Sequence, residues 1–248
     1  MPTPWISAAL LACLVVASGC GGSKEPVTKV DTPNATTGAA PATAETGAQT
    51  PVALSELPDA LKTDAYEYYG LGNTKPMDLE RTVAGDPNVV TGSQRFWLKE
   101  VKDGKATFVV ERTGGFASVG DSELSLEPDG LYAMSSTIGK ITPHQLELPA
   151  KLDVGTSWTS ETKLEEANGI SLEQKATNKV VKMEKVSTKA GDYDALLVES
   201  SGPAKINGES MEMRTRAWFV KGLGAVKMEI VQIPKSGPKQ TITIQATK

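Results

Sequence analysis

The sequence has few of the residues from which most catalytic and metal centres are built. Its 248 residues include one histidine and two cysteines, and both cysteines lie within the first 20 positions. A zinc site therefore has almost no ligands available, and a Ser-His-Asp triad has only His144 as a candidate base. That histidine lies in the turn-like stretch "ITPHQ", which is typical of an exposed residue. No glycine-rich phosphate loop is present. We therefore expect no catalysis, no metal and no cofactor.

Aromatic residues and positive charge are also scarce. Aromatic side chains make up 5% of the chain, and the net charge is −4 with an isoelectric point of about 5.3. An acidic protein has no electrostatic attraction for nucleic acid or for an anionic membrane surface, so neither is expected as a charge-driven partner. Because the chain after position 20 contains no cysteine, no disulfide can brace its fold.

The longest apolar stretch, residues 5–17, lies near the N-terminus. It is shorter than the roughly 20 residues that a membrane-spanning helix needs, and it is typical of the core of an export signal. Small residues then lead to a cysteine in "VASGC" (16–20). This motif resembles the lipobox of bacterial lipoproteins, which implies that Cys20 receives a diacylglycerol thioether and becomes the new N-terminus. An ordinary signal peptide with a chance cysteine is the alternative. We predict a signal peptide over 1–19.

The next segment, through residue 58, has a different composition. It is rich in Gly, Pro, Ala and Thr and has no aromatic residue, so it cannot bury enough apolar surface to fold. We interpret residues 20–58 as the lipidated cysteine followed by a tether, with a mean reach on the order of 35 Å. Two or three acyl chains on Cys20 would hold the protein on a membrane. The expected location is the bacterial cell envelope, and Gly21 favours the outer membrane or the cell surface.

Residues 59–248 show a pattern of period two. Three two-residue turn signals connect extended runs at Asp103-Gly104, Asp129-Gly130 and Asn207-Gly208. In "AVKMEIVQI" (225–233), apolar side chains alternate with polar ones, as they do in "TITIQATK" (241–248). The pattern predicts an all-β fold, mainly antiparallel, in which a single sheet curls into a half-barrel or a barrel.

One short helix is predicted at the start of this domain. The stretch Ser55–Tyr69 offers Ser55 as an N-cap and has a proline in its first turn. Helical spacing places Leu57, Leu61 and Tyr68 on one stripe. We expect this helix to cover the interior of the sheet and leave a plugged barrel.

Three further motifs occur in order: "LELPAKLDVGTSWTS" (146–160), "KVSTKAGDYDALLVES" (185–200) and "AWFVKGLGAVKME" (217–229). An earlier stretch, "YEYYGLGNTKPM" (66–77), precedes them. The set resembles a β-rich domain of uncharacterised bacterial envelope lipoproteins. The resemblance implies a fold related in outline to the half-barrel lipoprotein carriers, and it implies no catalytic residue.

Few side chains stand out as candidates for a site. We interpret Trp97, Trp158, Trp218 and Tyr193 as pocket-wall or core residues, with core favoured because aromatics at strand spacing usually pack. The acidic pairs Asp192/Asp194, Asp121/Glu123 and Glu165/Glu166 lack the spacing of a calcium loop and are typical of solvated strand faces.

These observations leave three functions open. The first is a monomeric, non-catalytic binding or scaffolding module that presents its sheet to another envelope protein. The second is a carrier that holds an apolar ligand or lipid inside a half-barrel. The third is an enzyme that acts on cell-wall glycan through paired carboxylates. A filled core would favour the module, a deep apolar cavity the carrier, and two facing carboxyls the enzyme.

Overall fold

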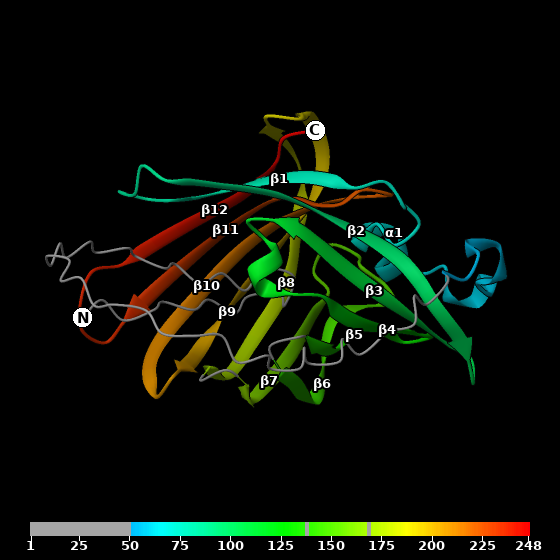
Figure 1. The fold of residues 1–248 in the computed structure, drawn as a ribbon, viewed down its shortest axis with the longest axis horizontal. Coiled ribbons are helices and arrows are strands. Elements are labelled where there is room, and N and C mark those ends of the chain that lie inside the picture. Colours follow the sequence, from blue (N-terminus) through cyan, green and yellow to red (C-terminus); the bar gives the residue numbers. More distant parts are fainter. Residues whose placement is uncertain (1–50, 137–138, 168–169) are drawn as a thin grey trace, which may run out of the picture.

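A computed structural model describes residues 51–136, 139–167 and 170–248. The predicted signal peptide, Cys20 and most of the predicted tether lie outside these residues. Within them, twelve strands form one closed antiparallel barrel (Figure 1). The strands are β1 (Met77–Val83), β2 (Val89–Lys102), β3 (Lys105–Gly114), β4 (Ser122–Glu127), β5 (Gly130–Ser136), β6 (Gly139–Pro149), β7 (Ser157–Ala167), β8 (Ile170–Thr188), β9 (Gly191–Ile206), β10 (Glu209–Val220), β11 (Gly224–Pro234) and β12 (Gln240–Ala246).

The order of strands is that of a simple meander. Each strand pairs with its neighbours in sequence, and β1 pairs with β12 to close the barrel, for example through Arg81 opposite Ile244. This confirms the predicted all-β antiparallel fold. Closure leaves no unpaired edge along the sheet.

Turn residues set the register of the hairpins. Asp103 and Gly104 both have positive φ (51° and 74°), as do Asn207 and Gly208 (48° and 85°). These are the backbone angles that Asp-Gly and Asn-Gly turns require, so both predicted hairpins are confirmed. The third hairpin also forms, but Gly130 is the first residue of β5 and pairs with Glu127.

The alternation predicted for β11 and β12 is present. In β11, Val226, Met228 and Ile230 are buried, whereas the residues between them are half-buried. The start of β9 differs from the prediction, because all four residues 195–198 are buried instead of every second one. A register shift between β8 and β9 lies here, and Leu197 pairs with the buried Trp218 of β10 on the outer side.

The predicted helix is broken into three short pieces. Two 3₁₀ turns, η1 (Leu54–Glu56) and η2 (Asp59–Leu61), precede the six-residue helix α1 (Asp64–Tyr69), and a further 3₁₀ turn, η3 (Ala117–Val119), follows β3. Ser55 therefore lies inside η1, and Thr63 is the N-cap of α1. The breaks also change which side chains point inward. Leu57 and Leu61 are buried as predicted, but Tyr69 is buried in place of Tyr68, which is half-buried.

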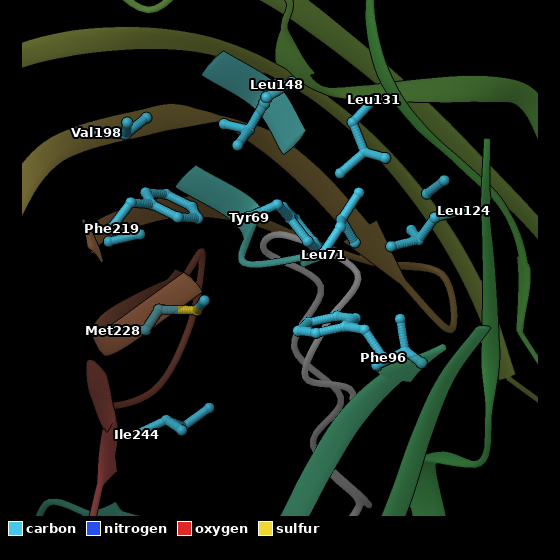
Figure 2. Close-up of a cluster of buried hydrophobic side chains, with 14 of the residues drawn as sticks. Tyr69, Leu71, Phe96, Leu124, Leu131, Leu148, Val198, Phe219, Met228 and Ile244 are labelled. Atoms are coloured by element: carbon cyan, nitrogen blue, oxygen red, sulfur yellow. The ribbon is translucent and has the colours of Figure 1, made fainter. Parts of the chain in front are cut away.

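This N-terminal segment, residues 52–71, plugs one end of the barrel. Its buried side chains belong to the same apolar cluster as the inner faces of the strands. Figure 2 shows Tyr69 and Leu71 surrounded by side chains from several strands, and the ring of Tyr69 lies 5.6 Å from that of Phe96. The plug is attached at both ends of α1. The amide of Asp64 donates to the carbonyl of Ala150 (3.0 Å), and that of Gly222 donates to the carbonyl of Glu67 (2.8 Å).

Two glycines allow this attachment at the C-terminal end of α1. Gly70 ends the helix in the left-handed conformation (φ 76°), and a Cβ there would lie 2.5 Å from the carbonyl carbon of Leu223. A Cβ on Gly224 (φ 98°) would lie 2.8 Å from the carbonyl oxygen of Tyr69. The glycines of the motifs "YYGLGN" and "KGLG" therefore let two backbones approach each other closely.

Candidate functional site

A large cavity lies over β6–β11, at the end of β10 that is opposite to the plug. Its volume is about 1130 Å³. That exceeds the range of roughly 300–1,000 Å³ typical of small-molecule sites. At the other end of β10, a smaller cavity of about 510 Å³ lies where Tyr66, Gly72 and Asn73 meet the turn at Gly222 and Leu223.

The strand register explains how the large cavity is lined. Most of its residues form three adjacent rows that cross the strands. The first row holds Lys163, Glu173, Lys205 and Ser210, with Lys235 one residue past the end of β11. The second holds Thr162, Gln174, Ala204, Met211 and Pro234, and the third holds Glu161, Lys175, Pro203, Glu212 and Ile233. Successive side chains of a strand point to opposite faces of the sheet. The first and third rows therefore share one face and the second row has the other.

Exposure agrees with this arrangement. In the middle row, Thr162, Ala204 and Met211 are buried, whereas every lysine and glutamate of the cavity is exposed. The hydroxyl of Thr162 donates a hydrogen bond to the side-chain oxygen of Gln145. The amide of Gln145 in turn donates to Glu147 Oε1 (2.9 Å). A buried polar chain thus runs from the middle row into the barrel.

Charge in the cavity is distributed unevenly. Two of its carboxylates have cationic partners: Glu161 lies 3.8 Å from Lys175, and Glu212 accepts a hydrogen bond from Arg214 Nε (2.8 Å). In contrast, Lys163, Lys205 and Lys235 form no ion pair or side-chain hydrogen bond with any described residue. Their ammonium groups remain available to an anionic group of a ligand.

The four aromatic residues singled out from the sequence do not line either cavity. Trp218 is buried in the wall of the barrel, where its Nε1 donates to Glu184 (2.8 Å) and its ring lies between Arg216 (4.8 Å) and Lys227 (5.1 Å). A hydrogen bond from Lys182 and then the one from Trp218 lower the pKa of Glu184.

The other three are half-buried. Trp158 and Tyr193 pack against the apolar cluster, and Trp97 lies on β2. The structure therefore distributes these four residues over the barrel wall and does not bring them together.

The acidic pairs have structural contacts where they are described. Asp194 forms an ion pair with Lys185 (3.0 Å), and Glu123 lies 2.5 Å from Lys99. Asp121 accepts a hydrogen bond from the amide of Arg112 (3.2 Å). The side chains of Glu165 and Glu166 lie outside the described residues. His144 is exposed, as predicted, but it lies within strand β6 and not in a turn.

No helix among the described residues is both long enough and apolar enough to cross a bilayer. No group of three or more His, Cys, Asp or Glu side chains among them could hold a metal ion.

Sequence reasoning missed the cavity because its lysines lie on separate strands. Each lies near a strand end, in "ETKLEE", "PAKING" and "IPKSG" (161–166, 203–208 and 233–237). The clustering of lysines beside hairpin ends was the available signal. Which of them share a row depends on register between strands, and that is set by the whole barrel.

Comparison with known proteins gives a family and a fold. Residues 99–242 match the DUF3108-like family model. A search of curated proteins returned no match. A solved structure of a predicted exported protein with a YmcC-like fold, from Bacteroides fragilis, is 11% identical, with a TM-score of 0.51 over 73% of this chain and 98% of that one.

Two lipoprotein structures are more distant. A predicted lipoprotein from Parabacteroides distasonis is 14% identical, with a TM-score of 0.45 over 71% of this chain and 96% of that one. The hypothetical lipoprotein YmcC from Escherichia coli is 8% identical, with a TM-score of 0.34 over 72% and 86%. At 11% identity, the likeness to the Bacteroides fragilis structure concerns the fold alone.

Proposed function

This chain belongs to the DUF3108-like family, and we propose a function for it that depends on the barrel, because the residues that match the family model run from β2 to β12. The protein is an exported lipoprotein of the bacterial envelope, held on a membrane through Cys20. It acts as a non-catalytic binding module, and the cavity over β6–β11 is its binding surface.

The plugged interior is the observation that carries this proposal. The side chains of Leu57, Leu61, Tyr69 and Leu71 are 5% exposed or less and belong to the apolar cluster of the barrel interior, where an acyl chain would need space. Figure 2 shows Tyr69 and Leu71 among side chains from the strands. A filled apolar interior supports a module over a lipid carrier. The large cavity that remains is lined mainly by lysine, glutamate, threonine and proline, with Met211 and Ile233 as its large apolar side chains, and the described lining residues include no leucine, valine or tryptophan.

The contacts of the acidic pairs support a role without catalysis. A glycan-cleaving enzyme needs two carboxyl groups that face each other across a cleft. Glu123 and Asp194 instead each contact a lysine, and Asp121 holds a backbone amide. Among the described residues, these contacts leave the pairs as parts of the strand faces.

The location rests on the N-terminal sequence. The apolar stretch followed by "VASGC" supports export and lipidation, and the related fold in Bacteroides fragilis belongs to a protein described as exported. A lipid anchor with a tether would hold the barrel clear of the membrane and leave the cavity accessible.

Photo-cross-linking in cells tests the binding surface. A photoreactive amino acid replaces Ser210, which is exposed and lines the cavity, and in a control it replaces Lys102, which is exposed at the β2–β3 turn. We expect an adduct of defined mass from position 210 and none from position 102. Adducts from both positions, or from neither, would contradict the proposed surface.

Native mass spectrometry tests the module against the carrier. The full lipoprotein, purified in a neutral detergent, should carry only the covalent lipid of Cys20. A stoichiometric phospholipid or fatty acid that is held without a covalent bond and is lost on organic extraction would overturn the module in favour of the carrier.

A further inference from the structure

The unpaired lysines of the cavity are regularly placed. Lys163 lies on β7 and Lys205 on β9, and both pair with Glu173 in one row across the sheet, whereas Lys235 directly follows Pro234 at the end of β11, beside that row. Neighbouring strands lie about 4.8 Å apart, so lysines on alternate strands originate about 10 Å from one another. We call these three residues the lysine row.

One carboxylate, that of Glu173, lies between Lys163 and Lys205. Glu173 of β8 pairs in register with both Lys163 and Lys205, yet it forms no ion pair within 4.0 Å with any described residue. The other two lining carboxylates, Glu161 and Glu212, already contact Lys175 and Arg214. The lysine row therefore has three positive charges and only Glu173 as a nearby lining carboxylate without a cationic partner among the described residues. The local charge is therefore positive, although the protein as a whole carries −4.

The kind of cation indicates the kind of anion. Arginine pairs with planar carboxylates through two parallel hydrogen bonds, whereas lysine is a point charge with three donors and suits tetrahedral oxyanions such as phosphate. The cavity is lined by four lysines and no arginine. We propose that it binds an extended ligand that carries several phosphate groups, with the lysine row contacting successive phosphates. This inference rests on the proposed binding function of the cavity.

The size and lining of the cavity favour an extended ligand over a single ion. A volume of about 1130 Å³ is far larger than one phosphate requires. Lysines that originate about 10 Å from one another also extend along the sheet and do not surround a single point. Among the described residues, no aromatic side chain lines the cavity, so these residues offer no platform for the stacking of nucleobases. Exposed Ser210, in the same row as Lys163 and Lys205, supplies a further hydroxyl group.

The occupant that the extended lysine row and the size of the cavity favour is a linear phosphate polymer, and the headgroups of a phospholipid surface are the alternative that the test separates from it. The probes are therefore linear inorganic polyphosphate with a terminal fluorophore, and vesicles of phosphatidylglycerol. Polyglutamate of similar length serves as the carboxylate comparison. Binding is measured on the full lipoprotein in neutral detergent for polyphosphate and polyglutamate, and on the lipoprotein reconstituted in neutral vesicles for the lipid surface.

Two triple variants with the same change in charge provide the matched comparison. The first is Lys163→Gln/Lys205→Gln/Lys235→Gln. The control is Lys75→Gln/Lys102→Gln/Lys248→Gln, whose lysines are exposed and do not line the large cavity. All six positions are exposed, so folding should be retained, and circular dichroism verifies it.

The expected results follow from the number of contacts. Each exposed charge contact contributes a factor of about two to five, so loss of the lysine row should weaken polyphosphate binding about ten- to hundredfold. The slope of log K against log salt should be about −2 for the wild type, as for three contacts with a flexible polyanion, and near zero for the first variant. Glu173→Gln should tighten binding about two- to fivefold, because it removes the only uncompensated carboxylate of the row.

Each other outcome has a definite meaning. Equal losses in the two triple variants would overturn the proposal, since binding would then depend on net charge alone, and polyglutamate binding as tight as polyphosphate would replace it with an acidic peptide. Binding to polyphosphate but not to vesicles assigns the phosphates to a polymer, and the reverse assigns them to a lipid surface. If no polyanion binds while the cross-linker at position 210 still forms its adduct, the phosphate inference fails and the proposed binding surface stands.

Discussion

Substitution of Gly70 by alanine should weaken the attachment of the plug. The residue has φ 76°, where an L-amino acid with a side chain costs about 1 kcal/mol more than glycine. Its new Cβ would also lie 2.5 to 2.7 Å from three backbone atoms of Leu223 and Gly224, which cannot rotate away as a side chain can. Relief of that overlap requires α1 to move away from the β10–β11 turn, at a cost of about 2 kcal/mol, as for overpacked cores.

A matched substitution isolates the close approach from the backbone strain. Gly222 has nearly the same φ (75°) and lies in the same junction, but a Cβ there would have no atom within 4 Å. Gly222→Ala should therefore cost only about 1 kcal/mol, against about 3 kcal/mol for Gly70→Ala. For a domain of this size, these costs correspond to losses in melting temperature of roughly 2–4 °C and 6–12 °C.

Thermal unfolding of the chain from residue 21, followed by far-ultraviolet circular dichroism, measures both variants. The hydrogen bond from the amide of residue 222 to Glu67 is retained in the control, because alanine keeps its N–H. Equal losses for the two substitutions would refute the close packing of backbones as the role of Gly70.

Three further substitutions test the plug, one ion pair and the anchor. Leu61→Ala, at a side chain 1% exposed, should lower the free energy of unfolding by about 2–5 kcal/mol in urea titrations, whereas Val154→Ala, at a side chain 60% exposed, should change it by less than about 0.5 kcal/mol. Lys189 Nζ lies 2.6 Å from Glu80, and its hydrogen bond, followed by that from Gln245, holds the pKa of this carboxyl below its usual value. The stabilisation is therefore present above the pKa of the unfolded carboxyl and is lost as the pH falls through the folded pKa, so Lys189→Met should lower the melting temperature at pH 7 and leave it unchanged at strongly acidic pH. Cys20→Ala should abolish incorporation of labelled fatty acid, and persistent label would show that the lipobox interpretation is wrong.

Much of the barrel could be predicted from local patterns. The alternation around Met228 and the turns at Asp103-Gly104 and Asn207-Gly208 depend on neighbouring residues alone, and the structure has them as predicted. The prediction of the N-terminal helix, which also used neighbouring residues alone, was partly correct. Its apolar residues Leu57 and Leu61 point inward, but the breaks between η1, η2 and α1 change the helical phase and replace Tyr68 by Tyr69 in the core.

The sequence by itself determined the antiparallel β class, the hairpin turns and the presence of an apolar segment ahead of the first strand, because each of these depends on residues that are close along the chain. Only the tertiary structure decided that β1 meets β12 and that Lys163 and Lys205 share one row, with Lys235 beside it. Those features depend on register between strands that are far apart in sequence. Register is set by the packing of the whole barrel, and a shift of a single residue would move each of these lysines to the opposite face of the sheet.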